Sequence, residues 1–227
     1  MRILLTNDDG IGAPGLLALE RGAAPFGRTT TIAPLEAHSG CGHKVTTHAP
    51  LLLSRSQAEY SYGLNGTPAD CVRIALHELG RFDLVLSGIN AGGNLGADVY
   101  ISGTVAAARE AAYHGIPAVA FSHYKRRESD FQWARASQWV PTILEWIQKQ
   151  PKIAGTFWNV NFPHLDEGQP DPESVLCPVG KHPLPLEFVK SEEGWIYSGI
   201  YHQRLRDEAC DIATCFGGKI AISRIEL

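Results

Sequence analysis

The sequence predicts an α/β fold, with a Rossmann-like, doubly wound and mainly parallel sheet and a β-rich C-terminal extension. Two observations lead to this prediction. Short apolar runs typical of buried strands alternate with helical patterns over residues 1–162. Beyond residue 162 the chain is rich in Pro and Gly and then resumes strand-like patterns. We expect a single domain over residues 1–227, with the core in residues 1–162 and an extension in residues 163–227.

The first strand is predicted at residues 2–6, a short, branched and mostly apolar run. Pro14 suits the first turn of a helix that continues through Leu19. Residues 34–44 form a long polar segment of small residues, which is typical of a functional loop. Further strands are expected at residues 29–33, 45–47 and 51–53.

The next helix has a clear start signal. Thr67 is suited to the N-cap, Pro68 to the first helical position and Asp70 to the first turn, and Gly80 should end the helix. A loop rich in Gly and Asn is expected at residues 89–96. The other core elements are expected to be strands at residues 83–88, 116–122 and 156–161, and helices at residues 105–114 and 130–150, the latter containing Pro141.

The extension begins with a segment rich in Pro and Gly over residues 163–185. Two strand-like runs at residues 187–190 and 195–200 flank a Ser-Glu-Glu-Gly turn, and this pattern predicts a projecting β-hairpin. A last alternating strand is expected at residues 219–225.

The composition excludes several classes of protein. Of the 227 residues, 44% are hydrophobic and 19% are charged, which is typical of a soluble globular protein. The net charge of −4 argues against binding to a nucleic-acid polymer, and no apolar stretch is long enough to span a membrane. One basic cluster, Lys125-Arg126-Arg127, is flanked by Glu128 and Asp130 and is more typical of a solvated loop.

The cysteines indicate a reducing compartment. Five cysteines, an odd number without a C-x-x-C pair, fit reduced thiols better than disulfides or a thiolate zinc site. Because the first strand begins at once and runs into carboxylates, we expect no signal peptide. The expected location is cytoplasmic.

The most informative feature is the end of the first strand, where Asn7, Asp8, Asp9 and Gly10 follow an apolar run. In open α/β sheets, ligands bind at the carboxyl ends of the strands. Two like charges at a buried strand end repel each other, so they favour binding of a hard divalent cation. A solvated turn is the alternative, because Asn, Asp and Gly are ordinary turn residues.

Polar residues at other strand ends extend this hypothesis. Asp8, Asp9, the Ser39 hydroxyl and the Asn90 amide form an oxygen-only set that suits one Mg²⁺ or Mn²⁺ ion better than zinc. Residues 102–104, Ser-Gly-Thr, precede a helix and could cradle a phosphate. The alternative for the serine is a simple N-cap.

Several blocks of the chain, taken in order, resemble the SurE survival-protein nucleotidases. The matching blocks are LLTNDDGIGAPGL (4–16), the Ser-Gly loop at residues 39–40 with Gly42 and Thr46, GTPADCV (66–72), DLVLSGINAGGNLG (83–96), YISGTV (100–105) and GIPAVAFS (115–122). The resemblance covers most of the first 162 residues, and several long blocks are more specific than any single motif.

This resemblance implies a divalent-metal-dependent phosphatase that hydrolyses nucleoside 5′- and 3′-monophosphates. The family's metal ligands fall on Asp8, Asp9, Ser39 and Asn90. Its phosphate-contacting positions match Gly40, Asn94, Ser102, Gly103 and Thr104. The family is typically dimeric or tetrameric, and its projecting hairpin helps assembly, which implies a homodimer or homotetramer.

We infer attack of a metal-activated water on the phosphoryl group, with Asp8, Asp9 and Asn94 as the catalytic residues. Asn94, Ser102 and Thr104 would stabilise charge on the phosphoryl oxygens, and Asp9 could help to orient the water. His38 and His43 are candidate proton donors to the leaving oxygen, although a lone loop histidine is more often a surface residue. Three tyrosines could stack a base, although aromatic residues more often pack: Tyr60, Tyr62 and Tyr100.

Other functions are weighed against this hypothesis. A non-catalytic nucleotide or phosphate sensor could use the same acidic pocket, and metal-dependent turnover distinguishes the two. Ser39 as a covalent nucleophile lacks an identifiable base. A dinucleotide-dependent oxidoreductase is disfavoured because the first strand leads to Asp-Asp-Gly and not to G-x-G-x-x-G. A haloacid-dehalogenase-type phosphatase is disfavoured because its two aspartates lie two residues apart, whereas these are adjacent.

Overall fold

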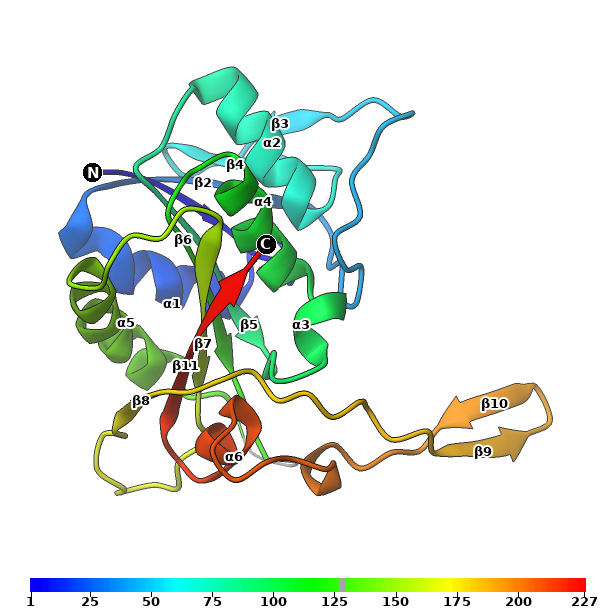
Figure 1. Cartoon of the computed structure of the whole chain (residues 1–227). Coiled ribbons are helices and arrows are strands. Elements are labelled where there is room, and N and C mark those ends of the chain that lie inside the picture. The colour runs from blue at the N-terminus through cyan, green and yellow to red at the C-terminus, as the bar shows by residue number, and fades with distance from the viewer. Residues whose placement is uncertain (127–129) are drawn as a thin grey trace.

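A nine-stranded, mostly parallel sheet forms the centre of the molecule in the computed structural model, which describes residues 1–126 and 130–227 (Figure 1). The strand order is β3-β4-β2-β1-β5-β6-β7-β11-β8. The parallel core comprises β1 (Arg2–Thr6), β2 (Arg28–Pro34), β4 (Ser61–Leu64), β5 (Leu84–Ala91), β6 (Ala118–His123) and β7 (Thr156–Phe162). The edges are formed by β3 (Leu53–Arg55), antiparallel to β4, and by β11 (Ile220–Glu226), antiparallel to β7 and parallel to β8 (Ser174–Leu176).

Helices cover both faces of the sheet. On one face α1 (Pro14–Ala23) packs beside α5 (Trp133–Gln148), and on the other face α2 (Pro68–Leu79) packs beside α4 (Gly103–Tyr113) (Figure 1). Side chains of β1 alternate between the two cores, because Ile3 and Leu5 join the first and Leu4 joins the second. The doubly wound α/β fold predicted from the sequence is therefore confirmed.

The order of the strands creates one topological switch point. Along the chain, β1 pairs with β2 on one side and with β5 on the other. The crossovers from β1 and from β5 therefore diverge, which opens a crevice at the edge where these strands end. We call this edge, where β1, β5, β6 and β7 end, the carboxyl edge, and the opposite one the amino edge.

Local rules explain several element boundaries. Thr67 caps α2 in a reciprocal capping box with Asp70, Pro68 takes the first helical position, and Gly80 ends the helix, as predicted. Pro141 lies inside α5, which is shorter than the predicted helix over residues 130–150.

Two predicted strands differ from the structure. Residues 45–47 form no strand, because the backbone N–H of Thr46 donates to the Asp70 carboxylate and not to a neighbouring strand. Of residues 51–53 only Leu53 is in a strand, β3. The sequence pattern does not predict β4, whose Gly63 leaves room for the Leu35 side chain. Three further short elements are also not predicted: β8, α3 (Asp98–Ile101) and α6 (Asp211–Phe216). Arg127 of the basic cluster and the flanking Glu128 lie outside the described residues.

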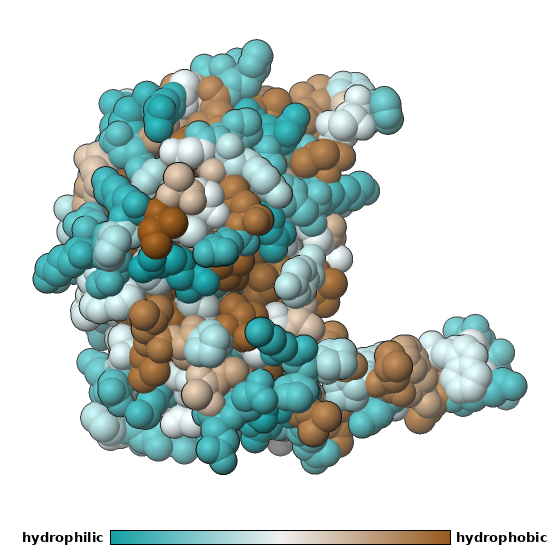
Figure 2. Space-filling model, viewed as in Figure 1, coloured by the Kyte–Doolittle hydropathy of each residue, from teal (hydrophilic) through white to brown (hydrophobic). Residues whose placement is uncertain are grey.

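The C-terminal extension has two parts. β8 and β11 continue the main sheet, and α6 packs on β11 in a small core that includes Tyr124 and Cys215. The predicted hairpin is present as β9 (Phe188–Ser191) and β10 (Gly194–Tyr197), and it projects away from the rest of the molecule (Figure 1). Hydrophobic side chains are exposed along this arm (Figure 2). Within the described residues, no helix combines the length and the apolar character needed to cross a membrane.

Helix α1 contacts β5 through backbone atoms at Gly15. A Cβ atom on Gly15 would lie 1.9 Å from the carbonyl oxygen of Ile89. We expect Gly15→Ala to lower the free energy of unfolding by about 1–3 kcal/mol, because the backbone of β5 cannot move aside freely. Urea denaturation measures this change. Gly12→Ala is the matched control, because its Cβ would meet nothing within 4 Å; equal stability of the two variants would contradict the prediction.

Candidate active site

The acidic pair predicted from the sequence lies at the topological switch point. Asp8 and Asp9 follow β1, and Asn90 lies near the end of the adjacent β5. The N-terminus of α4 faces the same point, because Thr104 contacts Asp8. The fold therefore brings together residues separated by more than 80 positions in the sequence.

Asp8 is held by the first turn of α4. The residue is only 5% exposed, and its carboxylate accepts hydrogen bonds from the Thr104 hydroxyl at 2.5 Å and from the Thr104 backbone N–H at 3.2 Å. Burial raises the pKa of Asp8 to about 6, with a further contribution from the charge of Asp9, while the bonds from Thr104 oppose the shift. Thr104 was expected to face a phosphate, but its hydroxyl donates to Asp8 here.

Asp9 is partly buried and points to β5. The backbone N–H of Ala91 donates to one of its oxygens at 2.9 Å, and burial raises its pKa. Within residues 1–126 and 130–227, neither Asp8 nor Asp9 forms an ion pair with Lys, Arg or His. The charge of this carboxylate pair is thus without a cationic side chain in the described protein.

Gly103 allows α4 to approach this closely. A Cβ atom there would lie 2.9 Å from the Cβ of Asp8 and 2.9 Å from the Sγ of Cys41. Ser102 precedes it, is buried, and accepts a hydrogen bond from the Val105 N–H at 3.1 Å as the N-cap of α4. The N-cap alternative for Ser102 is therefore present in the structure.

The Ser39 loop passes over the carboxyl end of β1. The His38 N–H donates to the Asp8 carbonyl at 2.7 Å, and the Gly42 N–H donates to the Ile101 carbonyl at 2.9 Å. Between these two hydrogen bonds, Ser39 and Gly40 are exposed. The loop thus holds the Ser39 backbone next to Asp8 without burying its hydroxyl.

A buried carboxylate in α4 anchors the same loop. Glu110 accepts from the His43 ring at 2.8 Å, and also from Arg73 and His114, each at 3.1 Å. Burial opposes ionisation of Glu110, but the hydrogen bonds from His43 and His114, the charge of His43 and the bond from Arg73 outweigh it and lower its pKa to about 2. His43, a candidate proton donor in the sequence analysis, is therefore engaged with Glu110.

Asp70 provides a second anchor from α2. Its carboxylate accepts from the Thr46 hydroxyl at 2.7 Å and from the Thr46 N–H at 2.9 Å. The Thr67 hydroxyl donates to the Lys44 carbonyl at 2.6 Å. The sequence analysis identified Thr67 and Asp70 only as helix-start residues, because a local pattern carries no information on their distant partners.

Asn90 and Asn94 flank the Gly-rich turn after β5. The Asn90 side-chain N–H donates to the Gly92 carbonyl at 2.8 Å, which leaves the amide oxygen available as a ligand. Asn94 is buried, and its side-chain amide donates to the Ser122 hydroxyl at 2.8 Å. Two asparagines from β7, missed from the sequence, fix its backbone: Asn159 and Asn161.

The tyrosines proposed to stack a base lie at different places. Tyr60 lies at the amino edge, where its ring packs under the Arg28 guanidinium, 3.9 Å from Cζ to the ring centre. Tyr62 follows in β4, and Tyr100 is 76% exposed on α3. Tyr60 is therefore misplaced for a role at the carboxyl edge.

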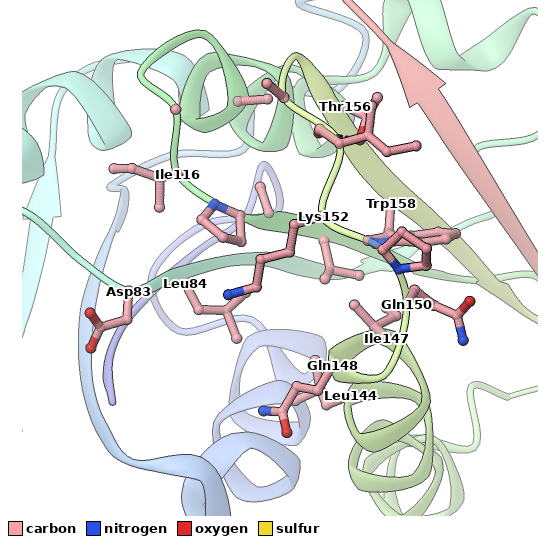
Figure 3. A pocket seen from close by; sticks show the side chains of 18 of the residues that line it. Asp83, Leu84, Ile116, Leu144, Ile147, Gln148, Gln150, Lys152, Thr156 and Trp158 are labelled. Atoms are coloured by element: carbon pink, nitrogen blue, oxygen red, sulfur yellow. Dashed lines mark hydrogen bonds between the residues drawn. The ribbon is translucent and has the colours of Figure 1, made fainter.

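One cavity of the described protein lies far from this acidic pair. Its volume is about 400 Å³, and the beginnings of β5, β6 and β7 and the end of α5 surround it at the amino edge (Figure 3). Its lining is mostly apolar, with Asp83 and Lys152 as the charged side chains. This cavity contains none of the site residues predicted from the sequence. Another cavity, of about 390 Å³, adjoins residues 91–93 at the carboxyl edge.

The donor set of the acidic site suits a hard cation. It offers two carboxylates, an amide oxygen and a hydroxyl, and oxygen ligands of this kind bind Mg²⁺ or Mn²⁺. In the described part of the chain, no group of three or more His, Cys, Asp or Glu residues is arranged to hold a metal. A site here therefore depends on the neutral oxygens of Ser39 and Asn90 as well as on the two acids.

We expect Glu110→Gln to lower the free energy of unfolding by about 1–2 kcal/mol at pH 7, because it removes the charge that three partly buried hydrogen bonds stabilise. The folded pKa of Glu110, about 2, lies below its ordinary value of 4.5, so its contribution is complete above that value and is lost as the pH falls toward 2. The difference between variant and wild type, measured by urea denaturation, should therefore be smaller at pH 3 than at pH 7.

Glu20→Gln, at an exposed position of α1, is the matched control and should change stability by less than about 0.5 kcal/mol. A difference for Glu110→Gln that does not depend on pH would exclude an ionised anchor.

Comparisons with known proteins show the family of this chain. A family model described as Survival protein SurE matches residues 3–182. A protein of Nostoc sp. is 47% identical over 100% of both chains. The protein named 5′-nucleotidase SurE of Neisseria gonorrhoeae is 35% identical over 100% of this chain and 93% of its own. The crystal structure of a SurE protein from Aquifex aeolicus superposes with a TM-score of 0.87 at 29% identity and covers 100% of this chain and 93% of that one. Because the family model spans most of the chain and full-length relatives exceed 30% identity, the protein belongs to the SurE family.

Proposed function

We propose that this protein is a divalent-metal-dependent phosphomonoesterase that hydrolyses nucleoside 5′- and 3′-monophosphates to nucleoside and phosphate. The observation that carries the proposal is the pair Asp8 and Asp9, adjacent at the switch point, with no cationic partner in the described residues. Relatives that match across the whole chain are named 5′-nucleotidase, which supports an enzyme and a nucleotide substrate.

Four residues would hold one Mg²⁺ or Mn²⁺ ion: Asp8, Asp9, Ser39 and Asn90. Such an ion, when bound, supplies a Lewis acid for a phosphoryl oxygen and lowers the pKa of a nearby water. The unpaired charge of the two carboxylates supports this assignment, because a cation relieves both their repulsion and the cost of burying Asp8.

The protein's own groups would orient the phosphate. In the first turn of α4 the N–H groups of Thr104 and Val105 donate to Asp8 and Ser102, so the Gly103 N–H is the one that would favour an anion there. The Ser102 hydroxyl and the exposed Gly40 backbone would supply further donors. Asn94 has used one side-chain N–H on Ser122, and the second would contact a phosphoryl oxygen.

The attacking group is then a water molecule that Asp9 orients. Asp9 uses one oxygen on the Ala91 N–H, and the other remains to accept a proton from water or to bind the cation. Ser39 is a weaker nucleophile candidate, because within the described residues its exposed hydroxyl forms no hydrogen bond to a histidine or carboxylate that could act as its base. A sensor that binds nucleotide without turnover is the second candidate, and the same experiment decides between them.

Phosphate release from AMP and GMP tests the proposal. After EDTA treatment the protein should be inactive, and Mg²⁺ or Mn²⁺ should restore turnover. Asp8→Asn should reduce kcat by more than roughly 100-fold, because it removes a proposed metal ligand. Mutation of a residue that only hydrogen-bonds to a metal ligand already lowers activity by up to about 100-fold. Thermal unfolding should show stabilisation by the metal in the wild type and none in Asp8→Asn.

Glu20→Gln is the control for the loss of a carboxylate at a distant, exposed position. Tight nucleotide binding without release would identify a sensor. Release that does not require a metal would contradict the mechanism and favour Ser39 as nucleophile.

The assembly proposed is a homodimer or homotetramer held by the hairpin. Phe188, Trp195 and Tyr197 lie on one face of the hairpin, Val189 and Ile196 lie on the other, and all five are exposed. A two-stranded ribbon cannot bury both of its faces, so a second copy of the chain is the expected cover. β8 and β11 extend the main sheet, which supports a single domain, and five free cysteines support a cytoplasmic location.

We expect the double variant Trp195→Ser with Ile196→Ser to weaken self-association by roughly 30-fold or more, since each buried aromatic or aliphatic anchor contributes strongly to an interface. Sedimentation velocity over a range of concentrations measures this. Lys190→Ser, opposite Trp195 in the same hairpin, is the matched control. A double variant with the assembly of the wild type would exclude the hairpin as the interface.

A further inference from the structure

The cavity of about 390 Å³ at the carboxyl edge has no role in the mechanism above. One wall is the turn of residues 91–93, which connects Asn90, the proposed metal ligand, to Asn94, the proposed phosphate contact. The Ala91 N–H on this turn holds Asp9. The cavity therefore opens directly beside the proposed reaction centre, on the side toward β6.

Aromatic rings form the other walls. Tyr124, Phe131, Tyr201 and His202 all line the cavity. Tyr124 and Tyr201 lie nearly parallel, with 6.2 Å between ring centres, and the Tyr124 hydroxyl is 3.1 Å from Nδ1 of His202. Flat rings on several sides suit a planar heterocyclic ligand, since bases stack on aromatic side chains whatever their sequence.

A buried ion pair fixes this wall. The Tyr201 hydroxyl donates to Asp98 at 2.7 Å and accepts from Arg204 at 3.1 Å, while Arg204 forms a salt bridge with Asp98 at 2.8 Å. The Tyr201 hydroxyl also lies 3.2 Å from the Gly93 carbonyl. The Tyr201 ring is therefore held in place without a ligand, which lowers the entropic cost of binding.

Among the described residues, the charged side chains that line the cavity are Lys125 and Arg126, and no Asp or Glu lines it. Arg126 also lies 4.0 Å from the Asp166 carboxylate, outside the lining. The Lys125 ammonium lies 4.6 Å from the centre of the Phe131 ring. Cationic donors beside aromatic faces match the ring nitrogens and carbonyl oxygens of a nucleobase, which are hydrogen-bond acceptors.

We propose that this cavity is the nucleoside subsite of the enzyme, with the base among Phe131, His202 and Tyr201 and the phosphate directed past residues 91–93 to the acidic pair. This inference rests on the proposed function. Such a subsite would give nucleotides a lower KM than simple phosphomonoesters, because contacts remote from the phosphate add binding energy in both the bound substrate and the transition state.

The test compares AMP with p-nitrophenyl phosphate, which carries no nucleoside. Phe131→Ala and His202→Ala should each raise KM for AMP roughly tenfold, the effect of losing one stacking contact, with kcat within about twofold. Both variants should hydrolyse p-nitrophenyl phosphate like the wild type. Adenosine should inhibit that reaction competitively in the wild type, with an inhibition constant roughly tenfold weaker in Phe131→Ala. Ile153→Ala, at the rim of the amino-edge cavity, is the control and should change no constant.

The possible outcomes distinguish failure of the nucleoside subsite from failure of the proposed phosphatase activity. Equal losses on both substrates would indicate a merely structural role and overturn the subsite. A raised KM for AMP in Tyr100→Ala, but not in Phe131→Ala, would place the base over α3 and also overturn it. Activity on p-nitrophenyl phosphate without any advantage for AMP would remove the subsite and leave the phosphatase intact. Absence of metal-dependent release from either substrate would refute the proposed function itself.

Discussion

Repulsion between two neighbouring carboxylates is the constraint on which the rest of the site depends. Asp8 is buried next to Asp9, and in the described protein its charge is compensated by the dipole and N–H of the first turn of α4, by the Thr104 hydroxyl and by its own backbone N–H, with no cationic side chain. A buried carboxylate without a cationic partner lowers the stability of a fold. Its presence at the switch point is therefore better explained by a ligand than by packing.

Two further carboxylates hold the segment that carries Ser39. Glu110 belongs to α4 and Asp70 to α2, the two helices that cover the same face of the sheet. Residues 34–50 contain almost no regular structure, so few backbone hydrogen bonds hold them in place. The hydrogen bonds to Glu110 and Asp70 fix this segment where a strand would have used backbone pairing. Packing of the core and placement of the loop are consequently coupled through α2 and α4, and a change in either helix reaches the site.

Much of this architecture could be predicted from local pattern. Each of these features depends on only a few consecutive residues: the apolar run of β1, the capping signal of Thr67 and Asp70, and the polar ends of β1 and β5. Their convergence also follows from the rule for parallel sheets. The bond from Thr104 to Asp8 and the second role of Asp70 depend on distances across the fold. For the same reason the local pattern wrongly predicts a strand at Thr46, since its carboxylate partner, Asp70, lies 24 positions away in the sequence.

The bare contact between Gly15 and the Ile89 carbonyl has a consequence for how this enzyme can diversify. Helix α1 follows Asp9 after only a few residues, and Asn90 follows Ile89 directly. Because this contact is between backbone atoms, any larger residue at Gly15 would push α1 away from β5. Sequence change near the acidic pair is therefore expected to spare Gly15 and to fall on positions whose side chains have room, such as Gly12.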